Sequence, residues 1–256
     1  MAFDFVQIRV FFRRGSGMVL KPFEPLRRRL AEKASHPGAP SVTYVAFGDS
    51  VTQGVMQYQI HEYELLYHRI CGRNLEQHFP GTVLNVINSG VSGDTALQSL
   101  ERWERDVQRY RPDLLTIMFG HNDVHAGAEG LPAFIDAIDE LIRRTKQGTE
   151  AEVVLITPCM MMKQDNERIA QAHREHIPQF VAIAEEQLLP LYVSALRKYA
   201  AERSIACLDA YGMWETMERQ GIDIHTRLAN GINHPDQLFH IELGNRLYHL
   251  LSGNTE

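Results

Sequence analysis

The chain has 256 residues, of which 44% are hydrophobic and 23% charged, an ordinary composition for a soluble globular protein. Its formal net charge of −6 at pH 7 gives no support for binding a nucleic-acid backbone, so we expect no nucleic-acid partner. Its three cysteines, Cys71, Cys159 and Cys207, are widely spaced and odd in number, which supports neither a disulfide framework nor a structural zinc site.

The first residues, MAFDFVQIRVFFRRGSG, lack the layout of a signal peptide, and charges interrupt their apolar run before it reaches membrane-spanning length. We therefore predict a cytoplasmic location and no membrane partner. Residues 1–17 fit neither a helix nor a strand, and a cleaner pattern begins at Met18, which is our hypothesis for the natural start. We expect an N-terminal extension and linker at 1–40 and one domain at 41–256.

Strand-like and helix-like segments alternate after the linker. Residues 42–47 form a β-branched and aromatic run that is typical of a buried strand, and 59–79 carry apolar residues at helical spacing. A second strand is predicted at 82–88. Thr95 is then a suitable N-cap for a helix over 96–110, which must end before Pro112.

The same alternation continues to the C-terminus. In chain order we predict a strand at 113–119, a helix at 131–146, a strand at 152–158, a helical region at about 166–202 broken or restarted at Pro178 and Pro190, a strand at 204–210 and a closing helix at 238–251. This order favours a parallel sheet covered by helices on both faces. In such sheets ligands bind beyond the carboxyl ends of the strands.

Several candidate catalytic residues fall at that edge of the predicted sheet. Ser50, in VAFGDSVTQG, follows the first strand and is either the cap of a short helix or a nucleophile. Gly93, in NSGVSGDT, either serves a turn or offers its N–H to an oxyanion. Asn122, in GHND, is either a turn former or an amide donor. His234, in NGINHPDQLFH, precedes the last helix and is the candidate base.

These four motifs occur in the order of the four blocks of the SGNH superfamily of GDSL-type esterases and lipases, which the chain resembles over about residues 42–251. The resemblance implies a flavodoxin-like three-layer α/β/α sandwich with a five-stranded parallel sheet. It also implies ester hydrolysis with Ser50 as nucleophile and His234 as base. The oxyanion hole would comprise the Ser50 N–H, the Gly93 N–H and the Asn122 side chain, and no metal or organic cofactor would be needed.

The segments VSGDTALQSLERWERDV and IMFGHNDV look closest to the bacterial branch that acts on acetylated carbohydrates, including xylan-oligosaccharide acetylesterases. The expected partner is therefore a small acylated substrate, with a carbohydrate as the candidate alcohol. Lipase or thioesterase activity within the same superfamily and a non-catalytic binding role are the alternatives. The sequence leaves open whether the protein forms a homo-oligomer.

The sequence departs from the family three positions before the histidine, where an aspartate usually orients the imidazole. That position is Gly231. A backbone carbonyl, the amide oxygen of Asn230, or a carboxylate from elsewhere such as Asp236 or Asp209 could replace it. Loss of this aspartate from a triad costs roughly 10⁴-fold in turnover where nothing substitutes for it.

Overall fold

The computed structural model describes residues 22–57 and 60–253. Five parallel strands form one sheet in the order β2-β1-β3-β4-β5, which is the flavodoxin-like order. The strands are β1 (Val42–Gly48), β2 (Leu84–Gly90), β3 (Leu114–Met118), β4 (Glu152–Ile156) and β5 (Ala206–Leu208). The predicted fold class and the five predicted strands are confirmed.

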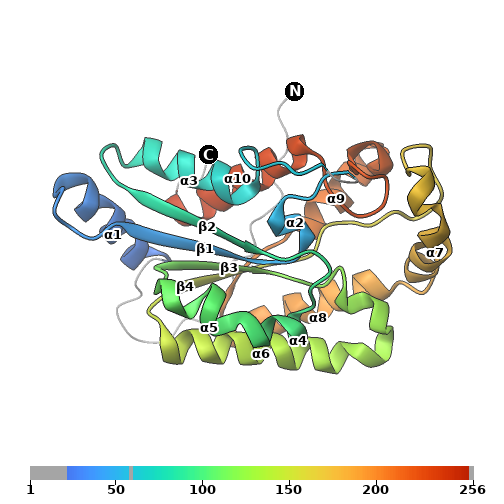
Figure 1. The fold of residues 1–256 in the computed structure, drawn as a ribbon, viewed down its shortest axis with the longest axis horizontal. Coiled ribbons are helices and arrows are strands. Elements are labelled where there is room, and N and C mark those ends of the chain that lie inside the picture. The colour runs from blue at the N-terminus through green and yellow to red at the C-terminus, as the bar shows by residue number, and fades with distance from the viewer. Residues whose placement is uncertain (1–21, 58–59, 254–256) are drawn as a thin grey trace.

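Helices cover both faces of the sheet (Figure 1). One layer contains α2 (Ser50–Gln53), α3 (Tyr67–His78), α9 (Ala210–Arg219) and α10 (Gln237–Ser252). The opposite layer contains α4 (Ala96–Ser99), α5 (Trp103–Asp106), α6 (Leu131–Gly148) and α8 (Leu188–Arg203). Helices α1 (Glu24–Ser35) and α7 (Ile177–Glu185) lie at the two ends of the molecule. Short 3₁₀ segments are η1 (Leu100–Arg102), η2 (Gln108–Tyr110), η3 (Asp123–Ala126), η4 (Ala128–Gly130), η5 (Gln171–His176) and η6 (Ile224–Arg227).

The central strands are apolar along nearly their whole length because helices bury them on both sides. In β1 only Thr43 is partly accessible, and all five residues of β3 are buried. Phe47 packs edge-to-face against Trp103 and Phe119. This packing fixes the carboxyl end of β1, where the chain enters Asp49 and Ser50.

The helix predicted over 59–79 is wrong in its first part, because α3 begins only at Tyr67. Residues 60–66 form a loop in which Ile60 and Tyr63 are more than half exposed. The Glu62 carboxylate accepts the backbone N–H groups of residues 63–65, which stabilises this loop in place of a helical turn.

The helix predicted over 96–110 is broken into α4, η1, α5 and η2. Its start is correct, since Thr95 is the N-cap and forms a capping box with Gln98. The Ser99 hydroxyl donates to the Ala96 carbonyl, competing with the helical pattern. Both Arg102 and Trp103 are buried along this interrupted path.

The helical region predicted at 166–202 comprises η5, α7 and α8. Pro178 and Pro190 each lie in the first turn of a helix, where a missing N–H leaves no hydrogen bond unmade, so the predicted restarts are correct. Helix α9 has no counterpart among the predicted elements. Helix α1 falls within the predicted extension, yet its Leu26 and Leu30 side chains are buried in the main core.

No helix within residues 22–57 and 60–253 is long and apolar enough to cross a membrane. The hypothesis that the chain starts naturally at Met18 concerns residues outside the described part.

Candidate active site

Ser50 is the first residue of α2, directly beyond the carboxyl end of β1. Asp49 is the N-cap, and its Oδ1 accepts the N–H of Val51 at 3.0 Å. Ser50 is 7% exposed. The strand-to-helix turn therefore holds the hydroxyl at the sheet edge, and Asp49 has a structural role as the cap of the turn.

His234 contacts this serine from a loop 184 positions further along the chain. Its Nε2 lies 3.0 Å from the Ser50 Oγ. The loop is closed by a bridge between Leu228 and Pro235, and Asp236 then caps α10 by accepting the N–H of Phe239. The two residues predicted as nucleophile and base are thus within hydrogen-bonding distance.

Gly93 and Asn122 lie beyond the ends of β2 and β3, the two strands that flank β1. The Asn122 amide donates one hydrogen to the Asp94 carbonyl at 2.9 Å, which leaves its second N–H available. Gly93 has a φ of +80°, and no atom lies within 4 Å of where a Cβ would be. Both predicted oxyanion donors are therefore at the same edge as Ser50.

Arg102 connects these segments, although no sequence motif predicted a role for it. Its guanidinium donates to the Asp94 carboxylate at 2.6 Å, the Ser89 carbonyl at 2.8 Å and the Gly48 carbonyl at 3.0 Å. It also lies 4.3 Å from the ring centroid of Phe47. One buried side chain thus links the ends of β1 and β2 to the turn that carries Gly93.

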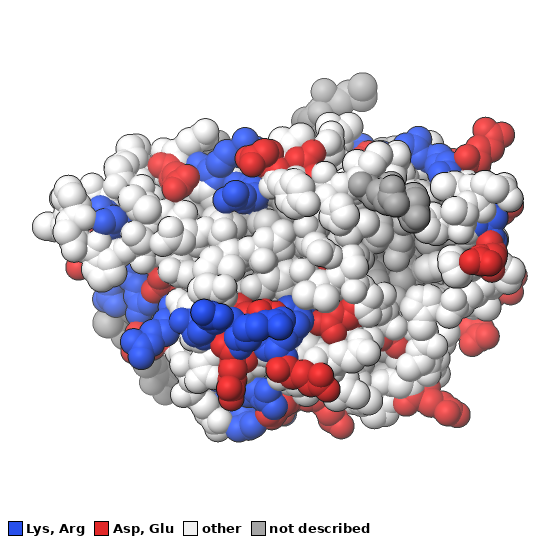
Figure 2. Space-filling model, viewed as in Figure 1, with Lys and Arg blue, Asp and Glu red and all other residues white. Residues whose placement is uncertain are grey.

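Lys and Arg side chains gather over α5 on the face shown in Figure 2, with Asp and Glu side chains beside them. Arg105 binds Asp106 through two hydrogen bonds of 2.6 and 2.8 Å, and Asp106 also contacts Arg102. The hydrogen bonds from Arg105 lower the pKa of the Asp106 carboxyl group. A helical segment carrying alternating charges is the one sequence signal that could have pointed to Arg102.

The second ring nitrogen of His234 meets a backbone carbonyl. Its Nδ1 lies 3.2 Å from the Met56 oxygen and 3.2 Å from the Asn230 Nδ2. The Asn230 oxygen is directed elsewhere, because it accepts the N–H groups of residues 232–234. Of the three groups proposed to orient the ring, the backbone carbonyl is the one found at the His234 Nδ1. The Asn230 amide oxygen points away from the ring.

The two carboxylates proposed for this role are engaged by arginines. Asp236 forms an ion pair with Arg227 at 2.8 Å in addition to capping α10. Asp209 caps α9 and binds Arg197 at 2.8 Å. Neither has a hydrogen bond to His234 among the contacts of the described residues.

Comparison with known proteins identifies the family of this chain. Residues 46–240 match the model of the GDSL-like Lipase/Acylhydrolase family. The chain belongs to this family. The matched range contains the serine, glycine, asparagine and histidine described above.

Two curated proteins are similar to parts of this GDSL-family chain. An acetylxylan esterase of Geobacillus stearothermophilus is 42% identical over 50 residues, which are 20% of this chain and 23% of that protein. The uncharacterized lipoprotein YqeF of Bacillus subtilis (strain 168) is 33% identical over 88 residues, or 34% of this chain and 35% of that protein. The chain thus spans about a quarter to a third of the curated relatives' length.

Solved structures resemble the whole fold. The acetylxylan esterase Axe2 of Geobacillus stearothermophilus has a TM-score of 0.62 at 20% identity, covering 82% of this chain and 94% of that one. A two-domain esterase (CEX) active on acetylated mannans has a TM-score of 0.66 at 17% identity, covering 91% of this chain and 54% of that one. At these identities the likeness establishes a shared fold.

Gly231 occupies the position of the usual family aspartate, and the structure explains its presence. Its φ is +72°, in the left-handed region. A Cβ there would lie 2.7 Å from the Asn166 Oδ1 and 2.9 Å from the Ile169 nitrogen. The segment after β4 fills the space that an aspartate side chain at 231 would need.

Burial determines the electrostatics of the GDSL-family site. Desolvation of the half-buried His234 ring lowers its pKa to about 4, although the Met56 carbonyl acts in the opposite direction. Desolvation also raises the pKa of Asp123 to about 7, and the nearby Asp49 adds to the rise. His121 lies behind the serine, with its Nδ1 3.6 Å from Asp49. A neutral imidazole at neutral pH is the form that can accept a proton.

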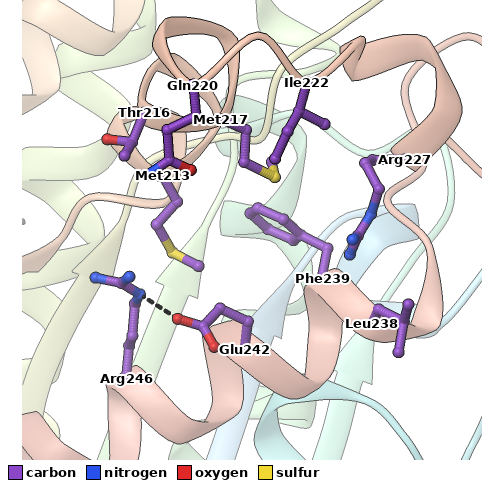
Figure 3. A pocket seen from close by; sticks show the side chains of 10 residues that line it. All are labelled: Met213, Thr216, Met217, Gln220, Ile222, Arg227, Leu238, Phe239, Glu242 and Arg246. Carbon is purple, nitrogen blue, oxygen red and sulfur yellow. Dashed lines mark hydrogen bonds and ion pairs between the residues drawn. The ribbon is translucent and has the colours of Figure 1, made fainter. Parts of the chain in front are cut away.

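Of the hollows in the structure, a polar one of about 560 Å³ lies at the turn that carries Gly93 and is lined in part by Ser92, Gly93, Gln98, Glu101 and Arg105. A second hollow of about 200 Å³ lies between α9 and α10, with the Met213, Met217 and Phe239 side chains facing one another and Arg246 paired with Glu242 (Figure 3). Ser50 and His234 line neither.

No three His, Cys, Asp or Glu side chains within the described ranges are grouped so that they could hold a metal ion.

Proposed function

We propose that the protein is a serine-dependent carboxylic ester hydrolase that removes acetyl or other short acyl groups from a carbohydrate or a similar small alcohol. The 3.0 Å separation between the Ser50 Oγ and the His234 Nε2 carries this proposal. Membership of a family of lipases and acylhydrolases supports it.

In the proposed reaction the Ser50 oxygen attacks the ester carbonyl carbon while its proton passes to the His234 Nε2. The carbonyl oxygen becomes an oxyanion, which the N–H groups of Ser50 and Gly93 and the free N–H of Asn122 stabilise. Collapse breaks the bond to the alcohol oxygen, which leaves with the proton from His234. Water then attacks the acyl-serine by the same steps, releasing the acid and regenerating the hydroxyl.

The Met56 carbonyl replaces the missing carboxylate as acceptor for the ring. A proton on Nδ1 that is donated to this carbonyl leaves Nε2 free to accept the serine proton. A neutral carbonyl stabilises the transient imidazolium less than a carboxylate would. We therefore expect turnover below that of a full triad.

A carbohydrate is the favoured alcohol for two reasons. The polar hollow beside Gly93 offers hydroxyl, amide, carboxylate and guanidinium groups, which suit a polyhydroxylated ligand. An acetylxylan esterase is locally similar in sequence, and esterases acting on acetylated xylan and mannan are similar in fold.

The test is a substrate series with matched variants. Purified protein is assayed with p-nitrophenyl acetate, butyrate and octanoate, and acetate release is measured from acetylated xylooligosaccharides, each with and without EDTA. We expect acetate esters to be preferred, EDTA to have no effect and Ser50→Ala to abolish turnover.

Preference for octanoate would support a lipase-type activity instead. Activity lost to EDTA but kept in Ser50→Ala would contradict the serine mechanism. No turnover of any ester, together with binding of acetylated oligosaccharides, would indicate a non-catalytic role.

A further inference from the structure

The side chain of Asn230 has only one orientation that satisfies its neighbours. Its Oδ1 accepts the backbone N–H groups of Ile232 at 2.9 Å and of Asn233 and His234 at 3.0 Å each. Because all three neighbours are donors, the oxygen must be placed there. The Nδ2 group therefore faces the Asn233 Oδ1 at 2.9 Å and the His234 Nδ1 at 3.2 Å.

The imidazole Nδ1 is consequently located between a donor and an acceptor. A neutral ring protonated on Nδ1 donates to the Met56 carbonyl, 3.2 Å away. A neutral ring protonated on Nε2 accepts from Asn230 and donates to Ser50. The Nδ1–H of the cation, like that of the Nδ1-protonated neutral ring, donates to Met56 and also faces the N–H of Asn230. Only the Nε2-protonated neutral ring gains a hydrogen bond from Asn230, so this amide stabilises a neutral form and offers the cation no acceptor.

Other charged groups near the ring do not reverse this effect. Asp49, at the end of β1, raises the pKa of His234, whereas His121 after β3 and His173 in η5 lower it. The buried His240 in α10 is also close enough to interact with the ring. The nearest candidate carboxylate in the same loop, Asp236, is held by an arginine, as described above.

We infer that Asn230 is a positioning residue that disfavours the protonated form of His234, and so keeps the base competent in acid while slowing the transfer step. This inference rests on the proposed function. A carboxylate at position 230 could complete a triad, whereas position 231 has no room for one.

The decisive variant is Asn230→Asp. One carboxylate oxygen keeps the three backbone hydrogen bonds, and the other replaces the donor at Nδ1 with an anionic acceptor. The Asn233 amide can turn over to donate to it. We expect the acid limb of the kcat/KM profile to move up by about 1–3 pH units, with an unchanged or higher plateau in kcat.

Asn233→Asp is the matched control, because it adds the same charge to the same loop at a side chain that faces Asn230 rather than the imidazole. It should shift the acid limb much less. An Asn230→Asp profile that coincides with the wild type, or an equal shift in both variants, would overturn the inference.

A measurement without turnover separates this inference from the proposed function. Nitrogen-15 NMR of labelled histidine, with the His234 signal identified by its loss in His234→Gln, follows the ring through a pH titration of the Ser50→Ala protein. A ring that titrates higher in Asn230→Asp than in Asn233→Asp supports the inference even if no ester is hydrolysed. Protonation at the ordinary value in otherwise unchanged protein would refute it, whether or not Asn230→Asp folds.

Discussion

The side chain of Asn166 packs directly against the backbone of Gly231. Its Nδ2 donates to the Gly231 carbonyl at 2.8 Å, and its Oδ1 lies 2.7 Å from where a Cβ at 231 would be. The chain that follows β4 thus occupies the place from which the family aspartate normally contacts the histidine. The missing carboxylate is part of a local repacking, and restoring it at position 231 itself requires a further change in the segment after β4.

The first prediction follows from this contact. Gly231→Asp should lower the free energy of unfolding by roughly 1–3 kcal/mol, because it combines an unfavourable left-handed φ with a steric clash. It should also lower kcat, since the displaced loop carries the base. Urea unfolding and ester assays measure both quantities.

Gly221→Ala is the control for backbone strain alone. Gly221 has a φ of +79°, and no atom lies within 4 Å of the place that a Cβ would take. Gly221→Ala should lower the free energy of unfolding less than Gly231→Asp does and leave turnover unchanged. A stable Gly231→Asp protein with raised kcat would show that the loop yields to the carboxylate.

A second prediction concerns Arg102, which binds the Asp94 carboxylate and the Gly48 carbonyl together. Arg102→Lys keeps the charge but cannot make both contacts from one planar group. We expect kcat to fall by up to about 10²-fold with a smaller change in KM, because the oxyanion donors are displaced relative to Ser50.

Arg143→Lys is the control for that experiment. Its side chain is 51% exposed and is paired with Glu140 on α6. It should change kcat by less than about twofold on the scale of surface substitutions. Equal losses in the two lysine variants would mean that Arg102 contributes only through charge or stability.

The amide of Asn122 gives a third prediction. One of its hydrogens is used by the Asp94 carbonyl, so the other is free for a developing oxyanion. Asn122→Ala should lower kcat by about 10²–10³-fold, the typical cost of one such donor, with little change in KM. Asn74→Ala is a suitable control, because the Asn74 amide binds Asn245 between α3 and α10, away from the site. A loss confined to KM would contradict the oxyanion role.

The sequence was sufficient to predict the sheet, because apolar runs bounded by Pro and Gly are local signals. The four motif residues were predicted from the order of their blocks along the chain. Ser50, Gly93 and Asn122 follow three adjacent strands, so the topology alone brings them to one edge. The late start of α3 and the breaks in the helix predicted over 96–110 were not predictable in the same way. The loop before α3 is stabilised by the Glu62 carboxylate, and the break after α4 coincides with the hydrogen bond from the Ser99 hydroxyl to the Ala96 carbonyl.

The partner of the histidine was also beyond the reach of sequence patterns. Met56 contributes a backbone carbonyl, which any residue type possesses, so its identity carries no signal. The sequence offers Asn230 as an acceptor through its oxygen, whereas the structure presents its nitrogen to the ring. Only the three backbone donors of residues 232–234 determine that orientation, and these depend on the folded loop.

The last prediction concerns His240, a buried residue of α10 whose ring stacks on Tyr67 at a centroid distance of 6.2 Å. Neither of its ring nitrogens has a hydrogen-bond partner among the described residues. Burial lowers its pKa to about 3, and the neighbouring His68 adds to the shift. Below about pH 6.5 the unfolded chain therefore takes up a proton that the folded protein does not, and stability is lost as the pH falls.

His240→Phe removes this acid sensitivity while keeping an aromatic ring against Tyr67. The free energy of unfolding of the variant, relative to wild type, should be higher by roughly 1–2 kcal/mol at about pH 5 than at about pH 8. Urea unfolding at both pH values measures it. His61→Phe, at an exposed ring, controls for the simple loss of a histidine. Equal effects of His240→Phe at the two pH values would mean that the buried ring is protonated in the folded protein, through a partner that the described residues do not supply.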